Sequence, residues 1–259
     1  MDQSIRVVAC RGDRECTPEN TIPAFESAIL KGADGIELDV HYTTDKELVV
    51  HHPFNLGHTD NGAGIVCEQT LARLKSLDSG SWFGEQFHGV TKPTLGEVLE
   101  CGKGRIRFEI DMYVSGLEFL QRVIREIEEF GLVDDVELTT AHYPLLVQAK
   151  KINPQICTGT FFYEPPEWMP VRLAQRHIVD WAQQLGLSVV HLNMTLMDPT
   201  FVAKLHRSGF VVYGSNLDTE EQIRKGLDLR IDSFSTGKLE LALRLRNEYS
   251  YSRPGKIAP

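Results

Sequence analysis

Two carboxylates separated by a single residue stand in the segment Gly35-Ile36-Glu37-Leu38-Asp39-Val40. The apolar residues alternate with the acids at the period of a β-strand, so Glu37 and Asp39 share one face. Two acids on one face of a buried strand repel each other and are costly to desolvate unless a cation or a proton compensates them. The segment therefore indicates half of a metal site or, more simply, an edge strand with two solvent-facing acids.

A third acid, Glu109, lies in another predicted strand, Arg107-Phe108-Glu109-Ile110-Asp111. If the apolar faces of both strands pack on surrounding helices, Glu109 points inward beside Glu37 and Asp39. Three oxygen ligands without cysteine or clustered histidine suit a hard divalent cation. We therefore expect one Mg²⁺ or Ca²⁺ at this position.

Arg11, His51 and His52 also follow predicted strands. An arginine, a hard cation and a histidine together suit a phosphate ester, because they combine charge neutralisation with proton transfer. A single histidine at such a position is more often a turn residue, so only the joint placement favours chemistry. His191 shares a face with Asn193, and it is equally well explained as a core histidine.

The elements that must position these residues alternate along the chain. The hydrophobic pattern predicts strands over residues 5–10, 35–40, 48–51, 105–111, 135–139, 156–162, 187–193, 210–213 and 230–234. It predicts helices over 21–31, with Asn20 as N-cap, and over 117–130, 143–151, 170–185, 199–207, 219–225 and 238–248. This rhythm, without a composition break, predicts a single α/β domain over residues 1–259, a (β/α)₈ TIM barrel. A doubly wound open sheet is the alternative, although the chain lacks the GxGxxG turn typical of it.

One connection is too long for an ordinary βα loop. Residues 53–93 are rich in glycine and contain Trp82, Phe83 and Phe87. Long irregular loops are usually functional, and this one leaves the second strand at its carboxyl end. We expect a small capping insertion over the barrel mouth that contributes to substrate selection, with Trp82 as a ligand contact.

Composition limits the classes of function. The 259 residues carry a net charge of −9, which disfavours a nucleic-acid-binding surface, and no apolar run is long enough to span a membrane. The five cysteines show no paired spacing, so we expect reduced thiols in a cytoplasmic protein. The expected partner is a small molecule, and the oligomeric state is left open.

Several segments carry a resemblance to a known family. They are Arg11-Gly12, Pro18-Glu19-Asn20-Thr21, Gly32 to Val40, Thr44-Asp45, Leu48-Val49-Val50, His52, Asn61-Gly62-Ala63-Gly64, Phe108-Glu109-Ile110 and Val212-Tyr213-Gly214-Ser215-Asn216. In order, spacing and residue type they resemble the glycerophosphodiester phosphodiesterase family, densely over residues 7–64 and more thinly afterwards.

The resemblance implies a TIM barrel that hydrolyses phosphodiesters of glycerol with Mg²⁺ or Ca²⁺. It implies that Glu37, Asp39 and Glu109 are metal ligands, Arg11 contacts the phosphate, and His52 is a catalytic acid or base. Tyr213 occupies the position of a family tryptophan and is a candidate substrate contact.

The chain also departs from the family pattern at several positions. Cys10 replaces the first catalytic histidine, Pro53 replaces an acid, Asp111 replaces a lysine, and Gly237 replaces an aspartate. A thiol takes over part of the work of a histidine only if its pKa is tuned, which makes Cys10 a second catalytic candidate. Asp111 exchanges a cation for an anion, which favours a substrate with its own hydroxyl or cationic group.

Three functions are compatible with this pattern. The first is a metal-dependent phosphodiesterase of lipid metabolism that hydrolyses a glycerol- or sugar-phosphate diester by acid–base chemistry. The second is a catalytically silent protein that binds such a diester or a sugar phosphate. The third is a phosphodiester synthase or transferase on the same scaffold.

Overall fold

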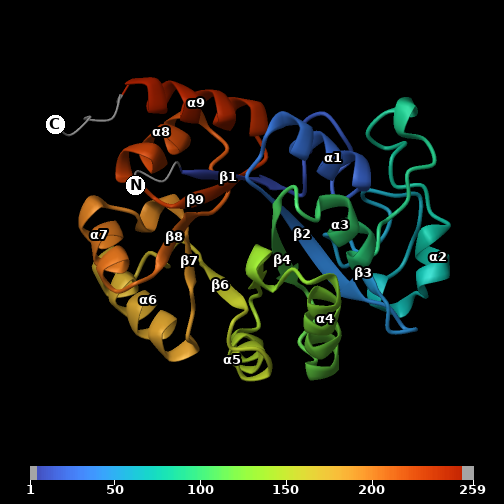
Figure 1. The fold of residues 1–259 in the computed structure, drawn as a ribbon, viewed down its shortest axis with the longest axis horizontal. Helices are drawn as coiled ribbons and strands as arrows, with labels where there is room; N and C mark the ends of the chain where they lie inside the picture. Colours follow the sequence, from blue (N-terminus) through green and yellow to red (C-terminus); the bar gives the residue numbers. More distant parts are fainter. Residues whose placement is uncertain (1–4, 253–259) are drawn as a thin grey trace.

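Eight parallel strands close into a barrel in the computed structural model, which describes residues 5–252 (Figure 1). They are β1 (Arg6–Cys10), β2 (Gly35–Tyr42), β4 (Arg107–Met112), β5 (Val136–Thr139), β6 (Cys157–Phe162), β7 (Val189–Leu192), β8 (Val211–Gly214) and β9 (Ser233–Thr236). Each strand pairs in parallel with the next, and β1 pairs with both β2 and β9. The predicted TIM barrel is confirmed, and the open sheet is wrong, because an open sheet leaves two edge strands unpaired.

Helices surround this barrel (Figure 1). They are α1 (Ile22–Lys31), α3 (Leu95–Gly102), α4 (Leu117–Phe130), α5 (Tyr143–Ile152), α6 (Val171–Leu185), α7 (Pro199–Arg207), α8 (Glu220–Leu229) and α9 (Leu239–Ser252). The sequence pattern did not predict α3. Its signal is the capping box of Thr94 and Glu97, in which each side chain accepts a hydrogen bond from the other residue's backbone N–H.

The first helix begins one residue later than expected. Thr21, not Asn20, is the N-cap of α1, and its hydroxyl accepts a hydrogen bond from the backbone N–H of Ala24. At the other end Gly32 has φ 85°, a left-handed conformation that glycine adopts without steric cost. The correction at Asn20 matters for function, because the asparagine side chain is free to bind elsewhere.

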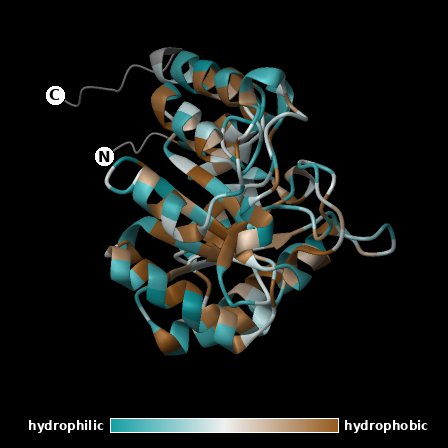
Figure 2. Cartoon of the chain, turned by 90° about the vertical axis from the view of Figure 1, so that its right-hand side faces the viewer, coloured by the Kyte–Doolittle hydropathy of each residue, from teal (hydrophilic) through white to brown (hydrophobic). Residues whose placement is uncertain are grey.

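The two faces of each barrel strand have different roles. Ile36, Leu38 and Val40 are fully buried in the apolar layer between the barrel and the helices. Apolar colour is concentrated on the central strands, whereas the surrounding helices show alternating apolar and polar bands (Figure 2). Because successive side chains of a strand point to opposite faces, Glu37 and Asp39 are turned into the barrel.

The long connection after the second strand forms a compact excursion. Strand β3 (Leu48–Val50) pairs antiparallel with β2, and the chain then passes through helix α2 (Leu71–Lys75) before it reaches α3. An apolar cluster of Val49, Leu56, Val66, Leu74 and Leu77 holds it together. Within it, the buried Lys92 Nζ lies 2.7 Å from Asp60 Oδ2 and 2.9 Å from Ser79 Oγ. The boundaries 53–93 and the capping role stay predictions.

Candidate active site

Four carboxylates line the inner face of two neighbouring strands. The parallel register of β2 and β4 sets Glu37 beside Glu109 and Asp39 beside Asp111. Glu37, Asp39 and Glu109 are each less than a tenth exposed. The expected proximity of Glu109 to Glu37 and Asp39 is therefore confirmed by the register.

Burial and mutual repulsion make these acids hard to ionise. Burial is the main cause that raises the pKa of Glu37, Asp39 and Glu109, and neighbouring negative charges add to it in each case. The same two causes raise the pKa of Asp111 to about 7. A group of acids with this electrostatic environment has to be compensated by protons or by cations.

Arg11 supplies one positive charge at the end of β1. Its Nε lies 3.4 Å from Asp39 Oδ2, and its Nη1 lies 3.1 Å from Glu19 Oε1. The backbone N–H of Arg11 donates to Glu37 Oε2 at 3.0 Å. Arg11 is left-handed, with φ 59°, and a Cβ at Gly12 would lie 2.6 Å from the backbone carbon of Ala24. The tight Arg11-Gly12 turn thus packs on α1 and aims the guanidinium at the acids.

Asn20 is a site residue that the sequence analysis assigned to a helix cap instead. Its Nδ2 donates to Asp39 Oδ2 at 2.7 Å, and it has a left-handed backbone with φ 55°. The Pro18-Glu19-Asn20-Thr21 segment contained the signal, since the glutamate in it binds Arg11 and the asparagine binds Asp39. The β1–α1 loop therefore holds Glu37 and Asp39 in place through Arg11 and Asn20.

Cys10 lies next to Glu37 inside the barrel and is only 6% exposed. Burial, followed by the charge of Glu37, raises the pKa of its thiol well above the usual value. A reactive cysteine requires the opposite shift, because the thiolate is the nucleophile and the base. Cys10 fills the position as a neutral thiol, and its catalytic role stays a prediction that this electrostatic environment disfavours.

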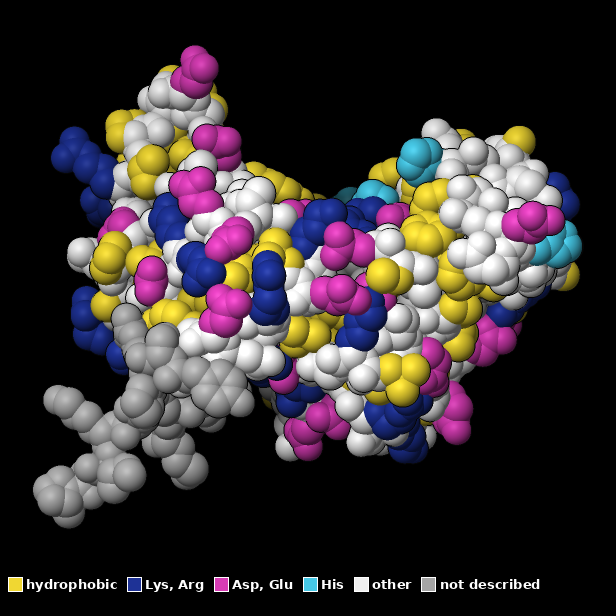
Figure 3. Space-filling view, turned by 90° about the horizontal axis from the view of Figure 1, so that it is seen from above, with side chains coloured by type: hydrophobic (Ala, Val, Ile, Leu, Met, Phe, Trp, Pro, Cys, Tyr) yellow, Lys and Arg dark blue, Asp and Glu magenta, His cyan; other side chains and the backbone are white. Residues whose placement is uncertain are grey.

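His52 follows β3 and is half-buried beside aromatic rings. Its imidazole packs edge-on against Tyr113 with ring centroids 5.7 Å apart, and its carbonyl lies 3.3 Å from His41 Nε2. Burial and the positive charge of Arg11 lower the pKa of His52 to about 4. The ring is therefore neutral near pH 7 and able to accept a proton. Acidic, basic and histidine side chains gather beside a hollow between two lobes of the molecule (Figure 3).

This shift predicts the acid limb of the pH profile. The proton-accepting form of His52 exists above its pKa and is lost as the pH falls through about 4. We expect kcat/KM, which reports the free enzyme, to stay high between pH 5 and 7 and to fall only near pH 4 when it is measured at a saturating divalent cation, so that the inner acids stay ionised. An acid limb centred near 6.5, the usual histidine value, would show that the ring is not held in this environment.

Glu109 reaches two aromatic residues on the β7–β8 side. The Tyr213 hydroxyl donates to Glu109 Oε2, while Glu109 Oε1 has no hydrogen-bond partner and lies 3.6 Å from His191 Nδ1. His191 Nε2 in turn lies 2.6 Å from Glu137 Oε1, and its ring stacks on Tyr213 at 4.0 Å. His191 is thus a fully buried histidine inside the barrel.

Most of the chain is similar to one family of known proteins. The glycerophosphoryl diester phosphodiesterase family matches residues 11–241 of the chain. The chain belongs to this family. A glycerophosphodiester phosphodiesterase from Caldanaerobacter subterraneus subsp. tengcongensis is 32% identical over 92% of this chain and 96% of its own length. One from Bacillus altitudinis is 31% identical over 94% and 98%.

Solved structures of the family share the fold. A phosphodiesterase from Oleispira antarctica, in complex with the product sn-glycerol-3-phosphate, aligns with a TM-score of 0.83 at 24% identity, over 93% of this chain and 96% of that one. A glycerophosphodiester phosphodiesterase from Agrobacterium tumefaciens aligns with a TM-score of 0.78 at 23% identity, over 93% and 99%.

Gly237, one of the departures from the family pattern, lies against the side chain of Arg14. A Cβ at Gly237 would lie 2.1 Å from Arg14 Nε and 2.2 Å from Arg14 Nη2. Arg14 also approaches Asp218, whose Oδ2 lies 3.3 Å from Nη2. Arg14 is thus a second arginine at the barrel mouth, and no local sequence pattern predicts it, because its place depends on the loops after β8 and β9.

The acids fit a hard divalent cation in chemistry and in charge. Glu109 keeps one buried oxygen without a partner, and burial together with neighbouring negative charges raises the pKa values of Asp39 and Glu109, which a bound cation would oppose. Among residues 5–252, however, no three His, Cys, Asp or Glu side chains already converge as a metal cluster. Asp39 and Glu109 bind Asn20 and Tyr213 instead, so some ligands would have to reorient. Their assignment as ligands stays a prediction.

Two predicted substrate contacts, Tyr213 and Trp82, differ in their surroundings. Tyr213 is buried beside an inner acid, whereas Trp82 is exposed but contacts only the insertion. Tyr213 is 1% exposed and bound to Glu109. Trp82 is 46% exposed, but its indole donates to the Ser79 carbonyl and its ring packs on Phe83, both within the insertion. The substrate-contact roles of Tyr213 and Trp82 stay predictions.

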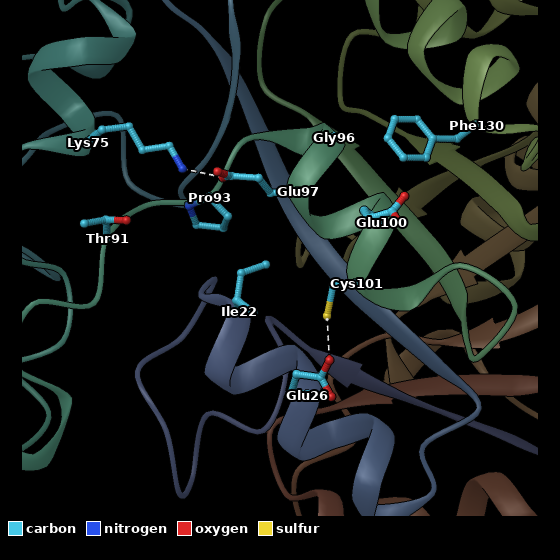
Figure 4. Close-up of a pocket in the computed structure, with 10 residues that line it drawn as sticks. All are labelled: Ile22, Glu26, Lys75, Thr91, Pro93, Gly96, Glu97, Glu100, Cys101 and Phe130. Carbon is cyan, nitrogen blue, oxygen red and sulfur yellow. Dashed lines mark hydrogen bonds and ion pairs between the residues drawn. The ribbon is translucent and has the colours of Figure 1, made fainter.

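A cavity of about 560 Å³ lies on the outside of the barrel beside α1 and α3 (Figure 4). Two of its three acids already have partners: Glu97 binds Lys75, and Glu26 binds both Cys101 and Arg105. None of the four inner acids, Glu37, Asp39, Glu109 and Asp111, lines this cavity. This outer cavity is therefore separate from the inner acids.

Proposed function

We propose that this protein hydrolyses glycerophosphodiesters to glycerol 3-phosphate and an alcohol. The observation that carries the proposal is the buried group of Glu37, Asp39 and Glu109, with Arg11 fixed beside it at the end of β1. Relatives that span nearly the whole chain bear the name of this activity, and a structural neighbour holds sn-glycerol-3-phosphate.

The proposal includes one divalent cation, Mg²⁺ or Ca²⁺, held by Glu37, Asp39 and Glu109. Carboxylate oxygens without thiolate or imidazole ligands match the preference of these ions. When bound, such a cation neutralises charge on the phosphate as a Lewis acid. It would also offset the burial and the mutual repulsion that raise the pKa values of the acids.

The remaining steps fall to side chains of this chain. Arg11 donates hydrogen bonds to a non-bridging phosphate oxygen, as a guanidinium does in charge-assisted pairs. His52, which is neutral near pH 7, accepts the proton of the attacking water as the new P–O bond forms. The bond between phosphorus and the alcohol oxygen breaks, and the proton passes to that oxygen. A neighbouring hydroxyl of the substrate, acting in place of water, would give a cyclic phosphate first.

We propose that the departing alcohol is selected by Asp111 and the insertion. Asp111 is partly exposed, and in its ionised form it places negative charge close to Tyr113 and Tyr163, whose pKa values are raised by burial and then by this charge. An anion among aromatic rings favours an alcohol that bears a cationic group. Trp82 of the insertion is the proposed contact for the more distant part of the substrate.

We further propose a cytoplasmic protein with no nucleic-acid partner. The five cysteines are free thiols, and the net charge of −9 disfavours polyanions. No helix within residues 5–252 is both long and apolar enough to cross a bilayer.

Phosphorus NMR of the purified protein with Mg²⁺ tests the function. The substrates are glycerophosphodiesters of choline, of ethanolamine and of the uncharged choline analogue 3,3-dimethylbutanol. Appearance of glycerol 3-phosphate is expected, fastest with the cationic alcohols. No product from any diester, with binding retained, would instead support the silent diester-binding protein, and a new diester from alcohol–phosphodonor mixtures would support a synthase.

A further inference from the structure

Arg14 lies at the barrel mouth between three loops. It belongs to the β1–α1 loop, Asp218 follows β8, and Gly237 follows β9. Since the carboxyl ends of parallel strands meet at one end of a barrel, all three residues lie at the same end of the barrel, where Arg11 also lies. The Arg14 side chain is 26% exposed, so it is open to solvent from this side.

The position of its guanidinium is built into the structure. A Cβ at position 237 would lie between 2.1 and 2.5 Å from three guanidinium atoms, so in this conformation the group lies directly against the glycine and would have to move if a larger residue stood there. Asp218 anchors it from the other side at 3.3 Å. Asp218 Oδ1 in turn accepts hydrogen bonds from the Gly237 backbone N–H at 2.7 Å and from the Thr236 hydroxyl at 3.1 Å.

The charge of Arg14 acts on the residues around the reaction site. Burial is the main cause of the lowered pKa of His52 and of the raised pKa of Cys10, and the positive charge of Arg14 adds to the first shift and opposes the second. Arg11 is already matched by two carboxylates, those of Glu19 and Asp39. Asp218, which binds Arg14, is itself 36% exposed, so the pair is open to a new anion from solvent.

We infer that Arg14 is a second phosphate-binding arginine, which contacts the phosphate of the diester and of the glycerol 3-phosphate product. This inference rests on the proposed function and adds a residue to it. A planar guanidinium with several parallel N–H donors suits phosphate oxygens, and it keeps free donors while Asp218 holds one edge. The two arginines then approach one phosphate from neighbouring positions of the same loop.

The test is the affinity of the full chain for sn-glycerol 3-phosphate, measured by calorimetry with Mg²⁺ present. For Arg14→Gln we expect Kd to rise about 10–100-fold, the effect of losing hydrogen bonds from a charged group. Arg14→Lys should be intermediate, because it keeps the charge and loses the planar fork. Arg224→Gln, which removes a surface arginine paired with Glu220 and Glu248, is the matched control and should bind like wild type.

A second variant tests the position of the group. In Gly237→Ala the arginine is retained but the new methyl group occupies its place, so Kd should rise in the same direction. In steady-state assays both Arg14→Gln and Gly237→Ala should raise KM for the diester more than they lower kcat. Unchanged Kd and KM in Arg14→Gln would overturn the inference, even if Gly237→Ala bound more weakly.

The inference and the proposed function fail in different ways. If wild type hydrolyses diesters and Arg14→Gln does so with the same KM, only the role of Arg14 is wrong. If wild type neither binds sn-glycerol 3-phosphate nor releases it from any diester, the proposed function is wrong as well.

Discussion

Replacing Glu37 by glutamine is expected to lower kcat/KM for glycerophosphodiesters by about 10³-fold or more. The substitution keeps the shape of the side chain and removes the negative charge of one proposed metal ligand. A catalytic cation contributes several kcal/mol of charge stabilisation, and each 1.36 kcal/mol corresponds to a factor of ten in rate. The measurement is the initial rate of glycerol 3-phosphate release at a fixed concentration of Mg²⁺.

The matched control for this variant is Glu126→Gln. Glu126 is also a buried glutamate, but it lies on α4 outside the barrel and binds Arg122. Its rate should stay within about twofold of wild type, as is usual for residues away from the reacting groups. A Glu37→Gln protein that is folded and as active as this control would show that the inner acids are not part of the reaction site.

The second large effect is expected at His52. Replacing it by alanine should lower kcat by about 10²–10⁴-fold, the usual contribution of a general acid or base. Cys10→Ala should cost less than about tenfold, because the raised pKa keeps the thiol protonated and unable to accept a proton. The comparison is made at saturating substrate, so that kcat reports the chemical step.

The control is His206→Ala, which removes a surface histidine that binds Asp232 next to α7. It should leave kcat unchanged. If Cys10→Ala were as damaging as His52→Ala, the thiol would carry an acid–base role that its burial and its position beside Glu37 argue against. Equal activity of wild type and His52→Ala would assign the proton transfer to another group, and His41, whose Nε2 lies 3.3 Å from the His52 carbonyl oxygen, is one candidate.

The inner acids were predictable because two regularities of the fold act locally. Alternation along β2 and β4 decides which side chains face inward, and parallel pairing sets Glu109 beside Glu37. Neither requires knowledge of distant contacts. The inward orientation of these acids could therefore be predicted from the pattern of apolar residues, and the closed barrel from the length of the chain and its alternation of strands and helices.

Contacts across the barrel were not predictable in the same way. Glu109 belongs to β4, whereas Tyr213 and His191 belong to β8 and β7, and their meeting depends on how the closed barrel tilts its strands. Arg14 depends on a missing Cβ at Gly237, more than two hundred residues further along the chain. Such positions are set by closure and loop packing, which no local pattern encodes.

Asn20 shows a different limit. Its residue type and its place before α1 fit a helix cap as well as a contact with Asp39, and the choice was made by the left-handed backbone at Asn20, with Thr21 serving as the cap. A sequence contains both possibilities. Only the path of the β1–α1 loop over the inner acids selects one of them.

Most of the proposed chemistry depends on a divalent cation bound by Glu37, Asp39 and Glu109. The most direct measurement is diester hydrolysis by protein stripped with EDTA, before and after Mg²⁺ or Ca²⁺ is returned, with Glu37→Gln treated in parallel. We predict that stripped wild type is inactive, that one of the two ions restores it in a saturable manner, and that Glu37→Gln is not restored. Full activity of the stripped protein, unchanged by either ion, would contradict the assignment of Glu37, Asp39 and Glu109 as a metal site.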